Sequence, residues 1–130
     1  ILIQNIIPEM IENNYGKIVN ISSIGGQWGG INQVHYAASK AGLISLTMSV
    51  AKMFSNKGIN CNSIAVGLVK TDMTLNELES NSGKDKIKNI PIGRIGESED
   101  VANTVSYLIS DDASYITGQT INLNGGMYFG

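Results

Sequence analysis

The spacing of apolar positions changes several times along the chain, and the first changes predict a helix followed by a strand. Residues 1–14 carry apolar side chains at helical spacing, and Pro8 inside that run is expected to kink the helix or to start a new segment. Residues 17–22 form a short β-branched and apolar run, which indicates a buried strand. The glycines of residues 25–30 then predict a loop.

A second helix and strand follow, and they define the fold class. Residues 35–56 have the apolar and small side chains of a long helix, which is expected to end at Lys57 and Gly58. Residues 59–66 indicate a second buried strand. A strand, a long crossover helix and another strand predict a right-handed parallel βαβ unit, and therefore an α/β fold with flanking helices.

The last third of the chain predicts one more helix and one more strand. Residues 72–90 are polar and weakly helical, and we interpret them as a mobile lid. A helix should open at Ser98, and residues 120–123 should form a final strand before two glycines. No repeat or interdomain linker interrupts residues 1–130, which we interpret as a single partial domain.

Composition narrows the class of protein. A chain of 130 residues that is 42% hydrophobic can bury one modest core. The net charge of −2, without a basic stripe, argues against binding to nucleic acid. The single cysteine fits a reducing compartment, so we expect a cytoplasmic protein. No apolar run is long enough to span a membrane, and Ile1 in place of Met suggests a fragment that lacks an N-terminal part.

Three side chains carry the most specific chemistry in the sequence. Tyr36 and Lys40 are four residues apart, so on a helix they project from one face. A neighbouring ammonium favours the ionised form of a phenol, which is otherwise too weak an acid to exchange protons readily at neutral pH. Ser23 follows the first predicted strand and Gly67 follows the second, so both should lie at the carboxyl edge of the sheet, where α/β folds bind ligands.

These residues belong to an ordered set of motifs that resembles the C-terminal half of the short-chain dehydrogenase/reductase family. The matching segments are residues 20–23, 36–42, 67–74, 91–96, 116–120 and 125–126. The order and identity of these residues are most similar to the branch of the family that contains β-ketoacyl-(acyl-carrier-protein) reductases, sugar and polyol dehydrogenases and hydroxysteroid dehydrogenases. The resemblance implies the C-terminal part of a Rossmann-type, doubly wound parallel sheet.

The same resemblance implies roles for individual residues. Tyr36 would be the general acid in reduction and the base in oxidation, and Lys40 would support it and bind the nicotinamide ribose. Ser23 would orient the substrate carbonyl. Val69, through its backbone, and Thr71 would lie near the nicotinamide of NAD(P)H.

Two positions need separate comment. Val66 stands where the family usually has a proline before Gly67, so the turn is expected to be less rigid while keeping its cofactor contact. Trp28 is either a loop anchor packed against the lid or a wall of the substrate pocket.

The family's fourth catalytic residue, an asparagine, and its glycine-rich dinucleotide loop would lie upstream of Ile1. The choice between NAD and NADP therefore stays open.

Alternatives also remain for the function. The leading hypothesis is an NAD(P)-dependent oxidoreductase that interconverts a ketone and a secondary alcohol, with 3-oxoacyl-(acyl-carrier-protein) reduction as one candidate. Polyol, sugar or hydroxysteroid substrates would use the same chemistry, and a truncated, non-catalytic fragment that serves only as an interaction surface is a different class. An acyl-carrier-protein partner would need basic residues; Lys17 and Lys57 could contribute, but Asn13 and Asn14 occupy a turn where such enzymes can carry positive charge.

Several other features have structural interpretations. The apolar end of residues 127–129 fits burial against a partner subunit, and the resemblance implies a homotetramer. Asp111 and Asp112 lack the further ligands that a metal site needs, so we expect none. Asn20 and Asn62 are expected to make structural hydrogen bonds, and Cys61 to be a buried, inert thiol.

Overall fold

A computed structural model describes residues 2–72, 74 and 80–130, and its centre is a three-stranded parallel sheet in the order β1-β2-β3. The strands are β1 (Gly16–Ser23), β2 (Ile59–Val66) and β3 (Thr120–Leu123). Their bounds match the predicted strands to within one residue, and the predicted parallel βαβ unit is confirmed.

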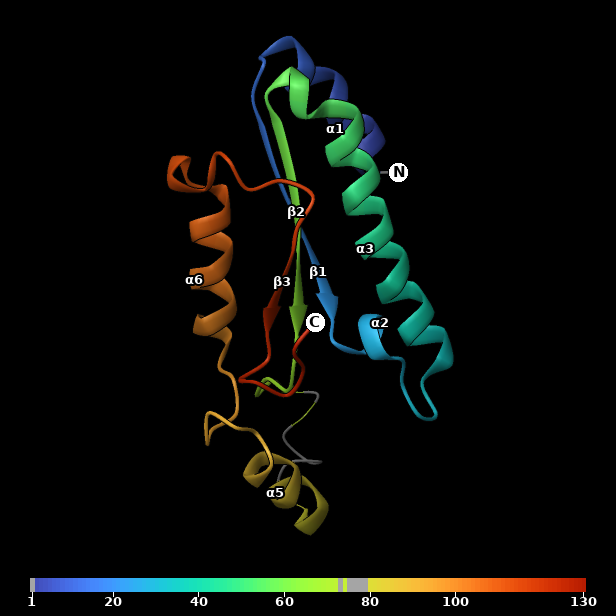
Figure 1. The fold of residues 1–130 in the computed structure, drawn as a ribbon, viewed down its shortest axis with the longest axis vertical. Helices are drawn as coiled ribbons and strands as arrows, with labels where there is room; N and C mark the ends of the chain where they lie inside the picture. Colours follow the sequence, from blue (N-terminus) through green and yellow to red (C-terminus); the bar gives the residue numbers. More distant parts are fainter. Residues whose placement is uncertain (1, 73, 75–79) are drawn as a thin grey trace.

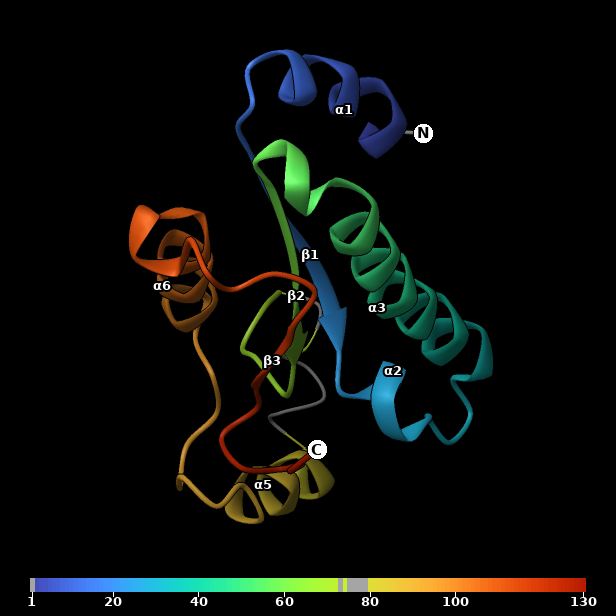
Figure 2. The same ribbon diagram turned by 45° about the horizontal axis from the view of Figure 1, so that its top comes forward.

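Helices cover both faces of the sheet (Figures 1 and 2). α1 (Leu2–Glu12) and α3 (Val34–Phe54) lie on one side of the strands, and α6 (Ser98–Ile109) lies on the other. Two short helices, α2 (Gly25–Trp28) and α5 (Asn81–Lys88), lie towards the ends at which the strands point. Single 3-10 turns, η1 (Ser55–Lys57) and η2 (Asp111–Ala113), complete the described elements.

The register of the sheet brings the ends of the three strands together. Ser23 pairs with Val66, and Val66 pairs with Leu123. The residues that follow each strand therefore leave the sheet at one common edge. This is the carboxyl edge at which the sequence predicts the functional residues.

One cluster of the core lies between β1, β2 and the helices α1 and α3. Ile7 of α1, Val50 and Ala51 of α3, and Ile59 and Cys61 of β2 form a cluster of buried side chains. Helix α1 runs through Pro8 from Leu2 to Glu12, so no new segment starts at the proline. Its tertiary contacts through Ile7 help to hold a helix that a proline alone would disfavour.

The predicted glycine loop is the clearest local error. Residues 25–28 form α2, because the backbone N–H groups of Gln27 and Trp28 both donate to the carbonyl of Ile24, at 2.9 and 3.1 Å. Ile24 is buried, so the turn is anchored to the core, and Gly29 ends it with a φ of 85°.

The predicted lid over residues 72–90 is tested only in part. Residues 73 and 75–79 lie outside the described residues, and α5 forms the C-terminal part of the segment. Within the described ranges, no helix has the length and apolar character needed to cross a membrane. In those same ranges no group of three or more potential metal-binding side chains comes together.

Candidate active site

Ser23 is the last residue of β1, where the strand turns into α2. The backbone N–H of Gly25 donates to its hydroxyl oxygen at 3.1 Å, which fixes the position of the serine side chain. The hydroxyl hydrogen is not used in that bond. Ser23 can therefore still donate to an oxygen at the carboxyl edge of the sheet.

Tyr36 and Lys40 lie together in the first turns of α3. The Lys40 Nζ atom is 5.6 Å from the centre of the Tyr36 ring, and it donates a hydrogen bond of 2.9 Å to the carbonyl of Ile21. The expectation that the two side chains share one helix face is confirmed. Tyr36 is 39% exposed, so a small molecule can reach it.

Gly25 shows that the serine and the tyrosine border the same space. A methyl group added at Gly25 would lie 3.5 Å from Ser23 Oγ and 3.7 Å from Tyr36 Cε1. The hydroxyl and the ring edge are therefore near neighbours, although they come from β1 and α3. The structure brings together the three residues that the sequence predicted as catalytic.

Two residues that the sequence analysis did not single out hold α3 against β1 at this point. The hydroxyl of Ser22, which is 2% exposed, donates to the carbonyl of Lys40 at 2.8 Å. A Cβ atom at Gly26 would come within 2.7 Å of the backbone carbon of Lys40, so α2 approaches α3 backbone to backbone. The motif Asn-Ile-Ser-Ser contains the signal for Ser22, because adjacent strand residues face opposite sides of the sheet.

Two asparagines make structural hydrogen bonds deeper in the fold: Asn20 joins β1 to α3, and Asn62 joins β2 to the residues before β3. Asn20 donates from Nδ2 to Thr47 Oγ1 at 2.8 Å, and Thr47 is fully buried. Asn62 donates to the carbonyl of Ile116 at 2.8 Å and accepts from the N–H of Gln119 at 3.0 Å. The structural interpretation of both asparagines is confirmed.

The Gly67–Thr71 segment leaves β2 at the same edge. The N–H of Gly67 donates to the carbonyl of Leu123 at 2.9 Å, and a Cβ atom at Gly67 would lie 2.7 Å from the Cα of Asn124. Glycine is therefore required here by the close approach of the residue that follows β3. The N–H of Thr71 and its hydroxyl contact the hydroxyl of Thr74, at 2.8 and 3.2 Å.

Val69 is held by a second segment of backbone. It forms an isolated parallel bridge with Gly96, in which Gly96 N–H donates to the carbonyl of Leu68 at 3.1 Å and Lys70 N–H donates to the carbonyl of Gly96 at 2.9 Å. The geometry shows how Gly67, Val69 and Thr71, three of the five predicted cofactor positions, are supported. Their contact with a cofactor stays a prediction.

Trp28 makes a contact that the sequence did not predict. Its ring packs edge-on against Tyr128, with ring centres 5.6 Å apart and planes at 76°, and 51% of the residue remains exposed. The contact joins α2 to the C-terminal segment. A role in the substrate pocket stays a prediction.

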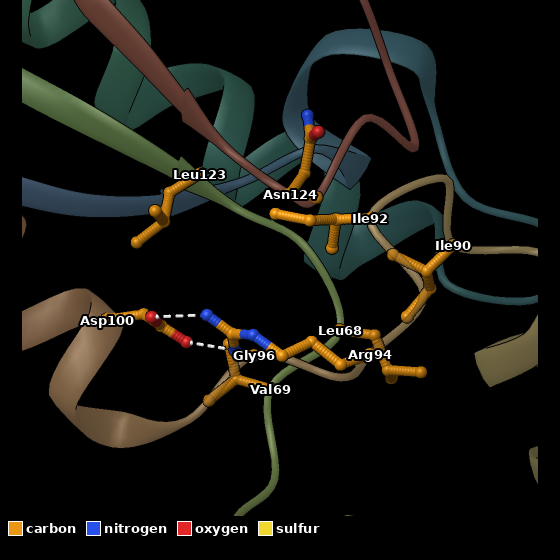
Figure 3. Close-up of a pocket in the computed structure, with 10 residues that line it drawn as sticks. Leu68, Val69, Ile90, Ile92, Arg94, Gly96, Asp100, Leu123 and Asn124 are labelled. Carbon is orange, nitrogen blue, oxygen red and sulfur yellow. Dashed lines mark hydrogen bonds and ion pairs between the residues drawn. The ribbon is translucent and has the colours of Figure 1, made fainter.

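A cavity of about 190 Å³ lies behind the Gly67–Thr71 segment. Figure 3 shows apolar side chains of Leu68, Val69, Ile92 and Leu123 around it, with Arg94 and Asp100 at one side. Arg94 donates to both carboxylate oxygens of Asp100, at 2.7 and 2.8 Å. The hydrogen bond from Arg94, followed by one from the N–H of Glu97, holds the pKa of the Asp100 carboxyl well below its usual range.

Cys61 takes no part in this site. It is fully buried in β2, and desolvation raises the pKa of its thiol to about 11. The prediction of a buried thiol is confirmed, and the raised pKa favours the less reactive, protonated form.

Comparison with known proteins places this geometry in context. Residues 1–128 match a protein family described as enoyl-(acyl carrier protein) reductase. The chain is similar to the 3-oxoacyl-(acyl-carrier-protein) reductases of Rickettsia felis, 49% identical over 127 residues, and Staphylococcus epidermidis, 45% identical over 126 residues. The alignments cover 98% and 97% of this chain but 52% and 51% of those proteins, so the chain spans about half the length of these curated relatives.

A solved structure gives the same result for the fold. The crystal structure of levodione reductase superimposes with a TM-score of 0.90 at 34% sequence identity, over 95% of this chain and 51% of that one. The expected fold class, a parallel α/β sheet with helices on both faces, is confirmed.

Proposed function

Because the chain belongs to the short-chain dehydrogenase/reductase family, we propose that the protein carrying it is an NAD(P)H-dependent oxidoreductase that interconverts a ketone and a secondary alcohol. The observation that carries the proposal is the grouping of Ser23, Tyr36 and Lys40 at the carboxyl edge of the sheet. A hydroxyl, a phenol and an ammonium in this arrangement suit reduction of a carbonyl, which needs a proton for the developing alkoxide.

Each side chain has a defined task in this reaction. Ser23 donates its free hydroxyl hydrogen to the substrate oxygen and holds the carbonyl in place. Tyr36 gives its phenolic proton to the same oxygen as negative charge develops there, and it takes the proton back in the oxidative direction. The Lys40 ammonium stabilises the phenolate that remains, because opposite charges at short range favour the ionised form.

The residues present fit the nicotinamide end of the cofactor. An ammonium has three N–H donors, and Lys40 uses one on Ile21, which leaves donors for ribose hydroxyls. Val69 and Thr71 lie on the segment that would hold the nicotinamide itself. When bound, the reduced nicotinamide supplies the hydride for the carbonyl carbon.

The pyrophosphate end needs residues from elsewhere in the protein. The 130 residues contain no two glycines spaced as Gly-x-Gly, the beginning of the usual dinucleotide-binding fingerprint. The proposed activity therefore belongs to the intact protein, which must supply that half of the cofactor site.

For the substrate we propose a 3-oxoacyl group carried on acyl carrier protein. The names of the curated relatives at 44–49% identity support this choice. Lys17 and Lys57, which the sequence analysis considered for an acidic carrier protein, lie at the start of β1 and just before β2, at the opposite edge of the sheet from Ser23. Lys17 also donates to Asn60 at 3.0 Å, so these two residues do not support the choice. Polyol, sugar and steroid ketones are the competing substrates.

The test is a comparison of substrates and variants in the intact protein. Oxidation of NADH or NADPH is followed with an acetoacetyl-loaded carrier protein, a keto-sugar and a ketosteroid, and we expect the first to react fastest. Tyr36→Phe should abolish turnover while cofactor binding, measured by nicotinamide fluorescence, is retained. The matched control is Tyr115→Phe, because Tyr115 is fully exposed and lies in the turn that follows η2.

Two results would contradict the proposal. Turnover by Tyr36→Phe at the wild-type rate would remove the phenol from the mechanism. A wild-type protein that oxidises neither NADH nor NADPH with any of the three ketones would leave the non-catalytic alternative in its place.

A further inference from the structure

We propose that Arg94 and Asp100 are positioning residues that hold the Gly67–Thr71 segment in the geometry needed for cofactor binding. This inference rests on the proposed function, since it assigns the support of that same site. Neither residue lines the space between Ser23 and Tyr36. They act through the backbone of Gly96, which bridges to the segment.

The ion pair has a geometry that restricts both of its partners. Two N–H groups of the guanidinium meet the two oxygens of Asp100 in parallel, and Arg94 Nη1 also donates to the carbonyl of Ile95 at 3.0 Å. One Asp100 oxygen accepts in addition from the N–H of Glu97 at 2.8 Å. The pair therefore fixes the turn between Arg94 and the first turn of α6, and Gly96 lies inside that turn.

Gly96 transmits this restraint to the cofactor segment. Its N–H and its carbonyl bond to Leu68 and Lys70, on either side of Val69. A Cβ atom at Gly96 would lie 3.0 Å from the Val69 side chain and 3.3 Å from the carbonyl of Leu68, so the two backbones are in close contact. A shift of Gly96 therefore moves the residue that we expect to meet the nicotinamide.

Apolar packing alone does not fix the segment from this side. The cavity of about 190 Å³ separates Leu68 and Val69 from Ile92 and Leu123, as Figure 3 shows. A space of this size can hold water, so these side chains do not all pack directly on one another. The directional bonds of Arg94, Asp100 and Gly96 therefore act on this segment together with the bond from Gly67 to Leu123 and the bond from Thr74 Oγ1 to the carbonyl of Val69, each of 2.9 Å.

Most exposed ion pairs contribute little to stability, but the geometry of the Arg94–Asp100 pair differs from that of most. The Arg94 side chain is 53% exposed and that of Asp100 is 31% exposed, but the pair is bidentate and part of a hydrogen-bond network. Lys88 and Asp85 form a contrasting pair, with a single contact at 3.4 Å and side chains 76% and 71% exposed. That pair provides the matched control.

The experiment measures cofactor binding and turnover separately in the intact protein. In Arg94→Gln, we expect the Kd of the preferred cofactor to rise about tenfold, because a loosened segment no longer presents its backbone in one position. At saturating cofactor, kcat should stay within about threefold of wild type, since Ser23, Tyr36 and Lys40 are held by other contacts. Lys88→Gln should change neither quantity.

A conservative variant keeps the test valid if Arg94→Gln folds poorly. Arg94→Lys keeps the positive charge beside Asp100 and leaves the bond from the Glu97 N–H to Asp100 in place, so it should lose less affinity than Arg94→Gln. All Kd values are measured below the unfolding transition, which far-UV circular dichroism defines for each variant. A general loss of folded protein would lower the amplitude of binding, whereas loss of positioning raises the Kd.

The outcomes separate this inference from the proposed function. If wild type binds and turns over, Tyr36→Phe is inactive and Arg94→Gln binds cofactor as tightly as wild type, the positioning role is wrong and the function stands. An equal loss of kcat and affinity in Arg94→Gln, or an Arg94→Lys variant that loses as much affinity as Arg94→Gln, also overturns the positioning role. A wild-type protein with no cofactor-dependent activity rejects the function itself.

Discussion

Ser23, Tyr36 and Lys40 are held by contacts within their own βαβ unit, whereas the Gly67–Thr71 segment is held by residues from the last third of the chain. On the first side of the site, which holds Ser23, Tyr36 and Lys40, Ser22 and Ile21 of β1 bond to Lys40, and α2 packs on α3 at Gly26. On the second side, which is the Gly67–Thr71 segment, the support comes from Leu123, Gly96 and the Arg94–Asp100 pair. In the proposed mechanism, proton transfer and the nicotinamide contact would therefore depend on different parts of the fold, and Lys40 would contribute to both.

The two sides also differ in the kind of interaction they use. The Ser22 hydroxyl is buried and bonds to a neutral carbonyl, so solvent and salt affect it little. Arg94 and Asp100 are partly exposed ions whose attraction depends on charge. Variants on the first side should therefore change stability and kcat together, while variants on the second should change cofactor affinity and respond to pH.

The largest effect should come from closing the contact between α2 and α3. Gly26→Val places a branched side chain 2.7 Å from the Lys40 backbone, and we expect a loss of about 3 kcal/mol in the free energy of unfolding. Gly42→Ala, in α3, is the control. A Cβ atom at Gly42 meets nothing within 4 Å, so alanine should stabilise the protein by roughly 0.5–1 kcal/mol.

Urea unfolding of the intact protein measures both values. Two variants of equal stability would show that the backbone contact between α2 and α3 is unimportant. The opposite signs that we expect would support the contact as one of the attachments of α3.

Lys40→Met should give the next largest effect and tests the ammonium directly. The change removes the charge beside Tyr36 and the bond to Ile21, so kcat/KM should fall by about a hundredfold, with weaker cofactor binding. Lys52→Met, an exposed lysine of the same helix, is the control in steady-state assays. Wild-type kinetics in Lys40→Met would contradict the proposed role.

A smaller effect is expected from Ser22→Ala. Loss of the buried bond to the Lys40 carbonyl should cost about 1 kcal/mol of stability and lower kcat, with the Kd of the cofactor little changed. Ser49→Ala removes an exposed bond within α3 and should be nearly neutral. A Ser22 variant with wild-type stability and kcat would break the proposed division between the two sides.

The smallest effect concerns the response of Asp100→Asn to acid. The folded protein holds the pKa of Asp100 below its unfolded value, so the carboxylate contributes stability above about pH 4, and this contribution is lost as the pH falls further. The difference in Tm between wild type and Asp100→Asn should be constant from about pH 8 to 5 and should shrink below about pH 4. The difference for Ser22→Ala should not follow this profile.

Much of the fold is encoded in local patterns. Ile59–Val66 and Thr120–Leu123 were predictable to the residue, because short β-branched runs between turn residues have few alternative structures. The spacing of Ser23, Tyr36 and Lys40 was enough to place them together, since one lies at a strand end and two on the helix that follows.

The remainder depends on contacts that spacing does not encode. Residues 25–28 looked like a glycine loop, but the buried carbonyl of Ile24 organises them into α2. Arg94 and Asp100 are visible in the sequence as ordinary surface charges, and only the turn through Gly96 brings them together. The packing of Trp28 on Tyr128 joins distant segments and needs the tertiary structure.

Strand β1 has a practical consequence for anyone who prepares this polypeptide. In the described sheet β1 pairs only with β2, and the carbonyl of Ile21 accepts a bond from the Lys40 side chain instead of from another strand. An open row of backbone donors and acceptors is a template for any extended peptide, including a second copy. We therefore expect these 130 residues to self-associate when they are purified alone at high concentration, and size-exclusion chromatography over a range of concentrations would show it.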